Sequence, residues 1–140
     1  MAAQPRSVLM ANDPVTGWKL PADERNRLLQ LVPPLFPNLV ADHVTLRAGT
    51  GPDTPLPEET SGVVVGEVDD GEGVQALILE IGGSTVRDDG GTYHITWSPA
   101  FGREAKESND VIARLGWRPL PAPAPVSIDL QPARWSRGGQ

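Results

Sequence analysis

Residues 63–81, VVVGEVDDGEGVQALILEI, decide the fold class of this chain. Two apolar runs, 63–68 and 74–81, flank the turn-forming residues DDGEG, which is a typical β-hairpin pattern. Earlier in the chain, residues 42–48 (DHVTLRA) alternate polar and apolar side chains and predict a half-buried strand. The same criteria predict further strands over residues 16–20, 93–97 and 126–130.

Two helices complete the predicted domain. Residues 22–31 follow Pro21, carry acidic side chains in the first turn and end before two prolines. Residues 109–115 form the second helix, with Ser108 as its N-cap and Gly116 as its C-terminal stop. Two helices with five or six strands predict an α+β domain with a largely antiparallel sheet. The 140 residues make a single domain, in which we expect 1–6 and 134–140 to be flexible.

The composition argues against several classes of function. With 12 Lys and Arg against 18 Asp and Glu, the net charge is -6, which disfavours binding of a long nucleic-acid duplex, because each phosphate contact needs a cation. The absence of Cys excludes a disulfide framework and a thiol nucleophile. No apolar run approaches the roughly 20 residues that span a bilayer, and the N-terminus lacks the apolar core of a secretory signal. We therefore expect a soluble, cytoplasmic monomer without a membrane partner.

The only two histidines occur in the same local setting. The chain reads HVTL from His43 and HITW from His94, so each His is followed two places later by Thr, although only eight of the 140 residues are Thr. Side chains of a strand alternate between its two faces, so His43 shares a face with Thr45 and His94 with Thr96. The apolar residues between them should face the core. Each segment therefore presents an imidazole and a hydroxyl to a groove.

Two imidazoles and two hydroxyls in one groove suit the cleavage of a phosphodiester. A neutral imidazole can take a proton from attacking water, and a protonated one can give a proton to the leaving oxygen. The ordinary pKa of His allows both forms near neutral pH. The threonine hydroxyls can donate hydrogen bonds to phosphate oxygens, where negative charge accumulates in the transition state. This chemistry requires neither a metal nor a cofactor.

The two segments resemble the signature motifs of the two-histidine (2H) phosphoesterase superfamily, which includes the cyclic phosphodiesterase domain of fungal tRNA ligases. The resemblance implies a compact bilobal fold with a central cleft. It also implies metal-independent hydrolysis of the 2′,3′-cyclic phosphate of a nucleotide or RNA end, as in RNA processing and repair. By position, His43 and His94 would be the acid–base pair, and Thr45 and Thr96 would contact the phosphate. The histidines are 51 residues apart, closer than is usual in that superfamily.

Five further residues are candidates for substrate binding. Arg47 and Ser98 each lie two places after a motif Thr, on the predicted face of the histidines. Trp18 could stack on a nucleobase. Arg103 and Lys106 follow the second motif and could hold a terminal phosphate. The alternatives are core packing for Trp18, simple solvent exposure at a strand end for Arg47 and Ser98, and a solvated loop for Arg103 and Lys106.

Several alternatives to a cyclic phosphodiesterase remain open. The histidines could be ordinary surface-strand residues, or they could bind zinc with Asp42 or with the acids at 88–89, although zinc usually takes three or four protein ligands. A related enzyme could cleave a 2′-5′ linkage or an ADP-ribose cyclic phosphate. The same groove could also bind a phosphorylated nucleotide or RNA end without turning it over.

Overall fold

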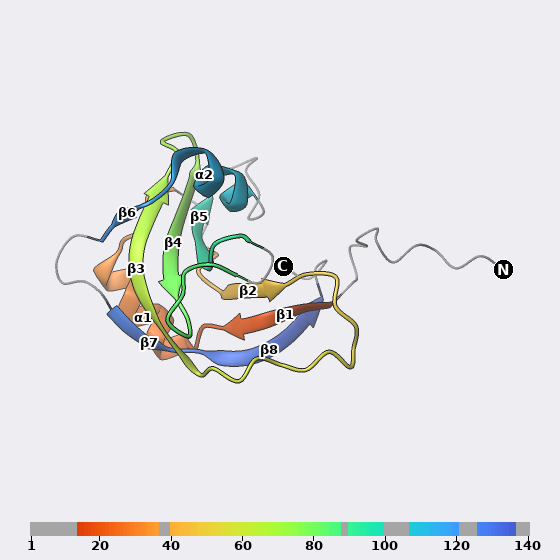
Figure 1. Cartoon of the computed structure of the whole chain (residues 1–140). Helices are drawn as coiled ribbons and strands as arrows, with labels where there is room; N and C mark the ends of the chain where they lie inside the picture. Colours follow the sequence, from red (N-terminus) through yellow and green to blue (C-terminus); the bar gives the residue numbers. More distant parts are fainter. Residues whose placement is uncertain (1–13, 37–39, 88–89, 100–106, 121–125, 137–140) are drawn as a thin grey trace.

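The computed structural model describes residues 14–36, 40–87, 90–99, 107–120 and 126–136 (Figure 1). Within these residues it has two helices, α1 (Ala22–Leu31) and α2 (Glu107–Leu115). The strands are β1 (Pro14–Lys19), β2 (His43–Arg47), β3 (Ser61–Asp69), β4 (Val74–Glu80), β5 (His94–Pro99), β6 (Arg118–Pro119), β7 (Val126–Asp129) and β8 (Gln131–Ser136). The predicted α+β class, with two helices and an antiparallel sheet, is confirmed.

The strands form one sheet in the order β6-β3-β4-β5-β2-β1-β8, with β7 also paired to β3. Only Leu130 separates β7 from β8, yet β7 pairs with β3 and β8 pairs with β1. This single extended segment therefore joins the two sides of the sheet, which closes on itself around the core (Figure 1). The prediction that the last strand is 126–130 and that the chain is flexible from 134 is wrong for residues 134–136, because β8 pairs with β1 along its length.

The inside of the closed sheet holds the main hydrophobic core. Val44 of β2 and Ile95 of β5 are directly paired there, and neither is exposed. Trp97 belongs to the same buried cluster, and its Nε1 donates to the carbonyl oxygen of Val32 at 2.8 Å. Leu28 of α1 completes this cluster. Burial of each such side chain is worth about 1.5–3 kcal/mol.

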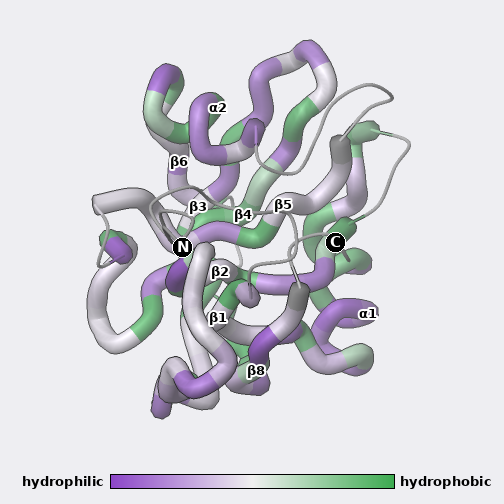
Figure 2. The backbone as a smooth tube through the Cα atoms, turned by 90° about the vertical axis from the view of Figure 1, so that its right-hand side faces the viewer, coloured by the Kyte–Doolittle hydropathy of each residue, from purple (hydrophilic) through white to green (hydrophobic). Residues whose placement is uncertain are grey.

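A second, smaller core lies on the outer face of the sheet, where α2 covers β3 and β4. Alternate residues of β4 point outward to meet this helix; the cluster consists of Val68, Val74, Ala76, Ile78, Val111 and Ile112. The continuous apolar run of β4 follows from this arrangement, because a strand buried on both faces needs no polar side. The two helices lie toward opposite ends of the molecule in both views (Figure 1, Figure 2).

The helix ends agree with the prediction except at Ser108. Helix α1 covers the predicted residues, and its N-terminal neighbour is Pro21. Gly116 ends α2 with φ of 72°, and its N–H donates to the carbonyl oxygen of Ile112 at 2.8 Å. Ser108 is not the N-cap, because α2 begins at Glu107 and Ser108 therefore lies within the helix. Its side chain is buried against the sheet. In the described residues, neither helix is long and apolar enough to cross a membrane.

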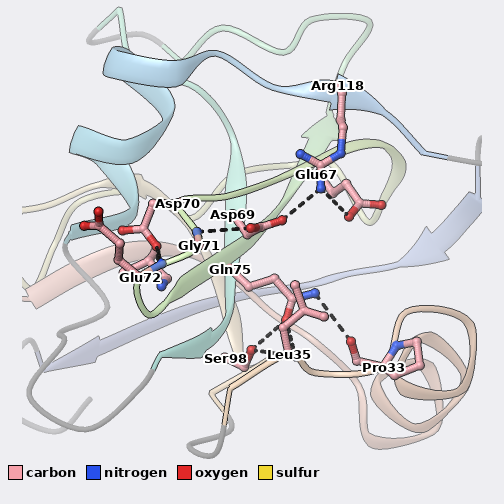
Figure 3. A network of polar contacts seen from close by, with 11 residues as sticks. Pro33, Leu35, Glu67, Asp69, Asp70, Gly71, Glu72, Gln75, Ser98 and Arg118 are labelled. Carbon is pink, nitrogen blue, oxygen red and sulfur yellow. Dashed lines mark hydrogen bonds and ion pairs between the residues drawn. The ribbon is translucent and has the colours of Figure 1, made fainter.

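The predicted hairpin joins β3 to β4 through an acidic turn (Figure 3). Asp70 Oδ1 accepts the backbone N–H of Glu72 at 2.9 Å and of Val74 at 3.0 Å. Arg118 of β6 donates to Asp69 at 2.9 Å. These carboxylates thus stabilise the turn and the neighbouring strand.

Candidate active site

The two histidine motifs lie side by side on the outer face of the sheet. Strands β2 and β5 are neighbours, and both members of the Val44–Ile95 pair face the main core. The residues before and after them in each strand consequently point outward. The outer face therefore carries His43 and Thr45 from β2 and His94 and Thr96 from β5. The imidazoles occupy diagonal positions of the antiparallel pair, for which the Cβ separation is roughly 7 Å.

Helix α1 and strand β5 position the turn that enters the first motif. Ala41, two residues before His43, has φ of 45°, a left-handed conformation that costs about 1–2 kcal/mol for a residue with a Cβ. Its N–H donates to Thr96 O at 2.9 Å, and its carbonyl oxygen accepts from Arg25 Nε at 3.0 Å. These two contacts hold the strained turn immediately before Asp42 and His43.

His43 is held by a carboxylate and by an aromatic ring. Its Nδ1 lies 3.1 Å from Asp42 Oδ2, and the same oxygen accepts from Lys19 Nζ at 2.6 Å. The ring of Trp135, from β8, lies 4.8 Å from the His43 ring, and only 10% of the His43 side chain is exposed. Burial lowers the pKa of His43 below its ordinary value, and the adjacent Asp42 carboxylate opposes this shift.

Asp42 keeps its charge despite partial burial. Burial raises its pKa, but the hydrogen bonds from Lys19 and His43 outweigh that effect, and the net shift is downward. A charged carboxylate at Nδ1 fixes the tautomer that leaves the Nε2 lone pair available, and it also favours the protonated imidazole. Asp42 therefore orients His43, a role that its position next to the histidine could have suggested.

His94 occupies a more apolar environment without a carboxylate. Its Nδ1 lies 2.9 Å from the carbonyl oxygen of Thr92, which can only accept, so Nδ1 carries the proton. Burial, followed by the positive charges of Arg87 and His43, lowers the pKa of His94 to about 4, although the Thr92 carbonyl opposes the shift. His94 is thus neutral at pH 7. The charge of His43 is the smallest of these contributions.

The second motif is also tied to helix α2. Thr96 Oγ1 and Ser108 Oγ are 2.8 Å apart, and both residues are buried. The first turn of α2 therefore lies next to the outer face of β5. Ser108 is a site neighbour that the sequence reasoning assigned to helix capping instead.

A pocket of about 440 Å³ opens next to the second motif. It lies between the 87–92 turn and α2, and its lining includes Arg87, Gly90, Gly91, Thr92, Asn109 and Asp110. Thr92, whose carbonyl oxygen contacts His94 Nδ1, is one of these lining residues. The guanidinium, amide, carboxylate and backbone groups of the pocket can bind polar ligands.

The prediction that Arg47 shares the face of the histidines is wrong because of an irregularity between β1 and β2. Gly17 pairs with Thr45, but the adjacent Thr16 pairs with Arg47, so β2 contains one extra residue at this point. Neighbouring residues of β1 face opposite sides, and cross-strand partners share a side. Arg47 therefore lies on the other face from Thr45.

Ser98 is displaced from the site in the same way. Ala76 pairs with Thr96, but the adjacent Gln75 pairs with Ser98, so the face predicted for Ser98 is also wrong. Ser98 is buried, donates to Gln75 Oε1 at 2.6 Å, and accepts from the N–H of Leu35 at 3.2 Å (Figure 3). Its hydroxyl anchors the chain after α1 to the sheet.

The remaining substrate-binding candidates are not part of the described site. Trp18 is 1% exposed, its Nε1 donates to Glu59 O at 2.9 Å, and it packs edge-on against Tyr93. This burial leaves no face for stacking on a nucleobase, so that expectation is corrected. Arg103 and Lys106 lie outside the described residues.

The described part of the chain contains no cluster of three or more His, Asp or Glu side chains placed to hold a metal ion. Comparison of the chain with family models, with curated proteins and with solved structures finds no match in any of the three. The chemistry available to this site must therefore be inferred from its own residues.

Proposed function

We propose that this protein is a metal-independent phosphodiesterase that hydrolyses the 2′,3′-cyclic phosphate of a nucleotide or RNA end. The observation that carries the proposal is the placement of both His-x-Thr segments on one face of adjacent strands, with the two imidazoles at diagonal positions of the pair. The similarity of the segments to the 2H phosphoesterase motifs supports the same reaction. Membership of that superfamily, its bilobal fold and a role in cytoplasmic RNA repair are parts of this proposal.

The unequal surroundings of the histidines suggest which is the base and which the acid. His94 is neutral and can take a proton from water at Nε2 while the water oxygen forms a bond to phosphorus. His43 lies against the Asp42 carboxylate, which favours its protonated form, and a bound phosphate anion would add to that effect. Protonated His43 then gives its proton to the ribose oxygen as the bond from that oxygen to phosphorus breaks. The reaction consumes one water and leaves a phosphate monoester.

Thr45 and Thr96 flank the space between the imidazoles and would donate to the non-bridging oxygens of the phosphate. Thr96 is held by Ser108, so its hydroxyl is already oriented before a substrate binds. The pocket beside Thr92 has the polar lining and the volume to accept the nucleoside part of the substrate.

Hydrolysis of the four 2′,3′-cyclic nucleoside monophosphates in EDTA, followed by ³¹P NMR, tests the proposal. We expect a monoester product and a loss of about 10²–10⁴-fold in kcat/KM for His43→Gln or His94→Gln. The kcat/KM of the double variant should be little lower than that of the less active single variant, because both residues act in one displacement. Arg47→Gln is the matched control, since Arg47 lies on the other face. Binding of the cyclic nucleotides without turnover would refute the proposed activity.

A further inference from the structure

Trp135 carries a buried hydrogen-bond donor that has nothing to donate to. Among the described residues, its Nε1 is the only buried side-chain nitrogen or oxygen without a hydrogen-bond partner. The indoles of Trp18 and Trp97 are also buried, but each donates to a backbone carbonyl. Leaving such a donor unpaired costs about 1–3 kcal/mol, and unpaired groups of this kind are rare in folded proteins.

This unpaired donor belongs to the surroundings of His43. Trp135 pairs with Val15 of β1, and its ring lies 4.8 Å from the imidazole of His43. Lys19 Nζ lies 4.7 Å from the centre of the same indole ring. The indole that carries the unpaired N–H and one cation are therefore both placed beside the first histidine. A negatively charged oxygen is the ligand that such a pair attracts.

We propose that Trp135 is a substrate-binding residue whose Nε1–H donates to an oxygen of the phosphate bound beside His43. Lys19 adds positive charge on the same side, while its hydrogen bond to Asp42 keeps it in place. The proposal deepens the function above and rests on it for the identity of the anion. It assigns phosphate binding on the β2 side of the site to two residues of β1 and β8.

The energetic signature of this role differs from that of a structural indole. A donor kept for a ligand destabilises the ligand-free protein, so its removal at constant shape should leave the thermal midpoint unchanged or raise it. Removal of a donor that has a protein partner should instead lower the thermal midpoint. Benzothienylalanine, in which sulfur replaces the indole N–H, makes this change with little alteration of shape.

The test compares benzothienylalanine at Trp135 with the same replacement at Trp97, whose Nε1 donates to Val32 O. At position 135 we expect an unchanged or higher thermal midpoint and at least about tenfold weaker binding of 2′-AMP, as for loss of a hydrogen bond to a charged group. At position 97 we expect a lower midpoint and unchanged affinity. A lower midpoint with unchanged affinity at position 135 would overturn the proposal.

A titration followed through indole ¹H–¹⁵N resonances tests the contact directly, without turnover. Inorganic phosphate and 2′-AMP should shift the Trp135 resonance with saturation and leave those of Trp18 and Trp97 in place. A shift without hydrolysis would support Trp135 and refute the phosphodiesterase. Hydrolysis by a protein whose Trp135 resonance does not move would support the phosphodiesterase and refute the role of Trp135. If neither ligand moves the resonances of Trp135 or the His43 ring, there is no anion site here and the proposal fails.

Discussion

Burial of neutral His94 makes the stability of this protein depend on pH in a predictable window. In the unfolded chain the pKa of His is about 6.5, whereas in the folded protein the pKa of His94 is lowered to about 4. Between these values the unfolded state binds more protons than the folded state, so the free energy of unfolding falls as the pH drops. A difference of about 2.5 pKa units corresponds to about 3 kcal/mol.

Urea unfolding of the wild type and of His94→Gln at pH 7, 5.5 and 4 measures this contribution. The free energy of unfolding of the wild type should fall by about 3 kcal/mol more than that of the variant between pH 7 and pH 4, because other titrating groups cancel in the comparison. Such a difference is large beside the 5–15 kcal/mol that stabilise most domains.

His43→Gln serves as the control for this experiment. The Asp42 carboxylate offsets part of the effect of burial at His43, so removal of that imidazole should flatten the pH dependence less than removal of His94. Parallel curves for the wild type and His94→Gln would mean that His94 has the same pKa in the folded and unfolded chain, as a solvated imidazole would. The assignment of His94 as a buried neutral base would then be wrong.

Three further predictions concern activity. The pH profile of kcat/KM should be bell-shaped, with limbs that belong to the coupled pair: an acidic limb near pH 4 and a basic limb that burial of His43 moves below the ordinary range of His. Asp42→Asn should move the basic limb to still lower pH, because the carboxylate stabilises the imidazolium, and an unmoved limb would contradict this. Thr45→Val should lower kcat about 10²-fold, whereas Thr45→Ser should change it little, and neither should change the thermal midpoint. Equal kcat values for the two variants would exclude a transition-state hydrogen bond from Thr45. EDTA should leave the rate unchanged, whereas a loss that zinc restores would indicate a metal site.

Local patterns in the sequence were sufficient to predict most of the elements and the faces on which the four candidate site residues lie. The hairpin, the bounds of α1 and the stop at Gly116 follow from turn chemistry and periodicity within about ten residues. The face shared by His43 and Thr45, or by His94 and Thr96, follows from the alternation of a strand over three residues. The periodicity did not predict that β2 and β5 would be neighbours, and the resemblance to the 2H family implied only that the two motifs face a common cleft.

The tertiary structure alone decided everything that depends on which strands pair and where the pairing slips. One extra residue in β2 moves Arg47 to the other face, and a similar shift between β4 and β5 moves Ser98, because a one-residue slip reverses every later side chain. Strand β8 pairs with β1, which is more than 100 residues away in the chain, and this pairing places Trp135 next to His43. The pKa difference between the histidines likewise depends on burial and on neighbours from other strands, which no local pattern contains.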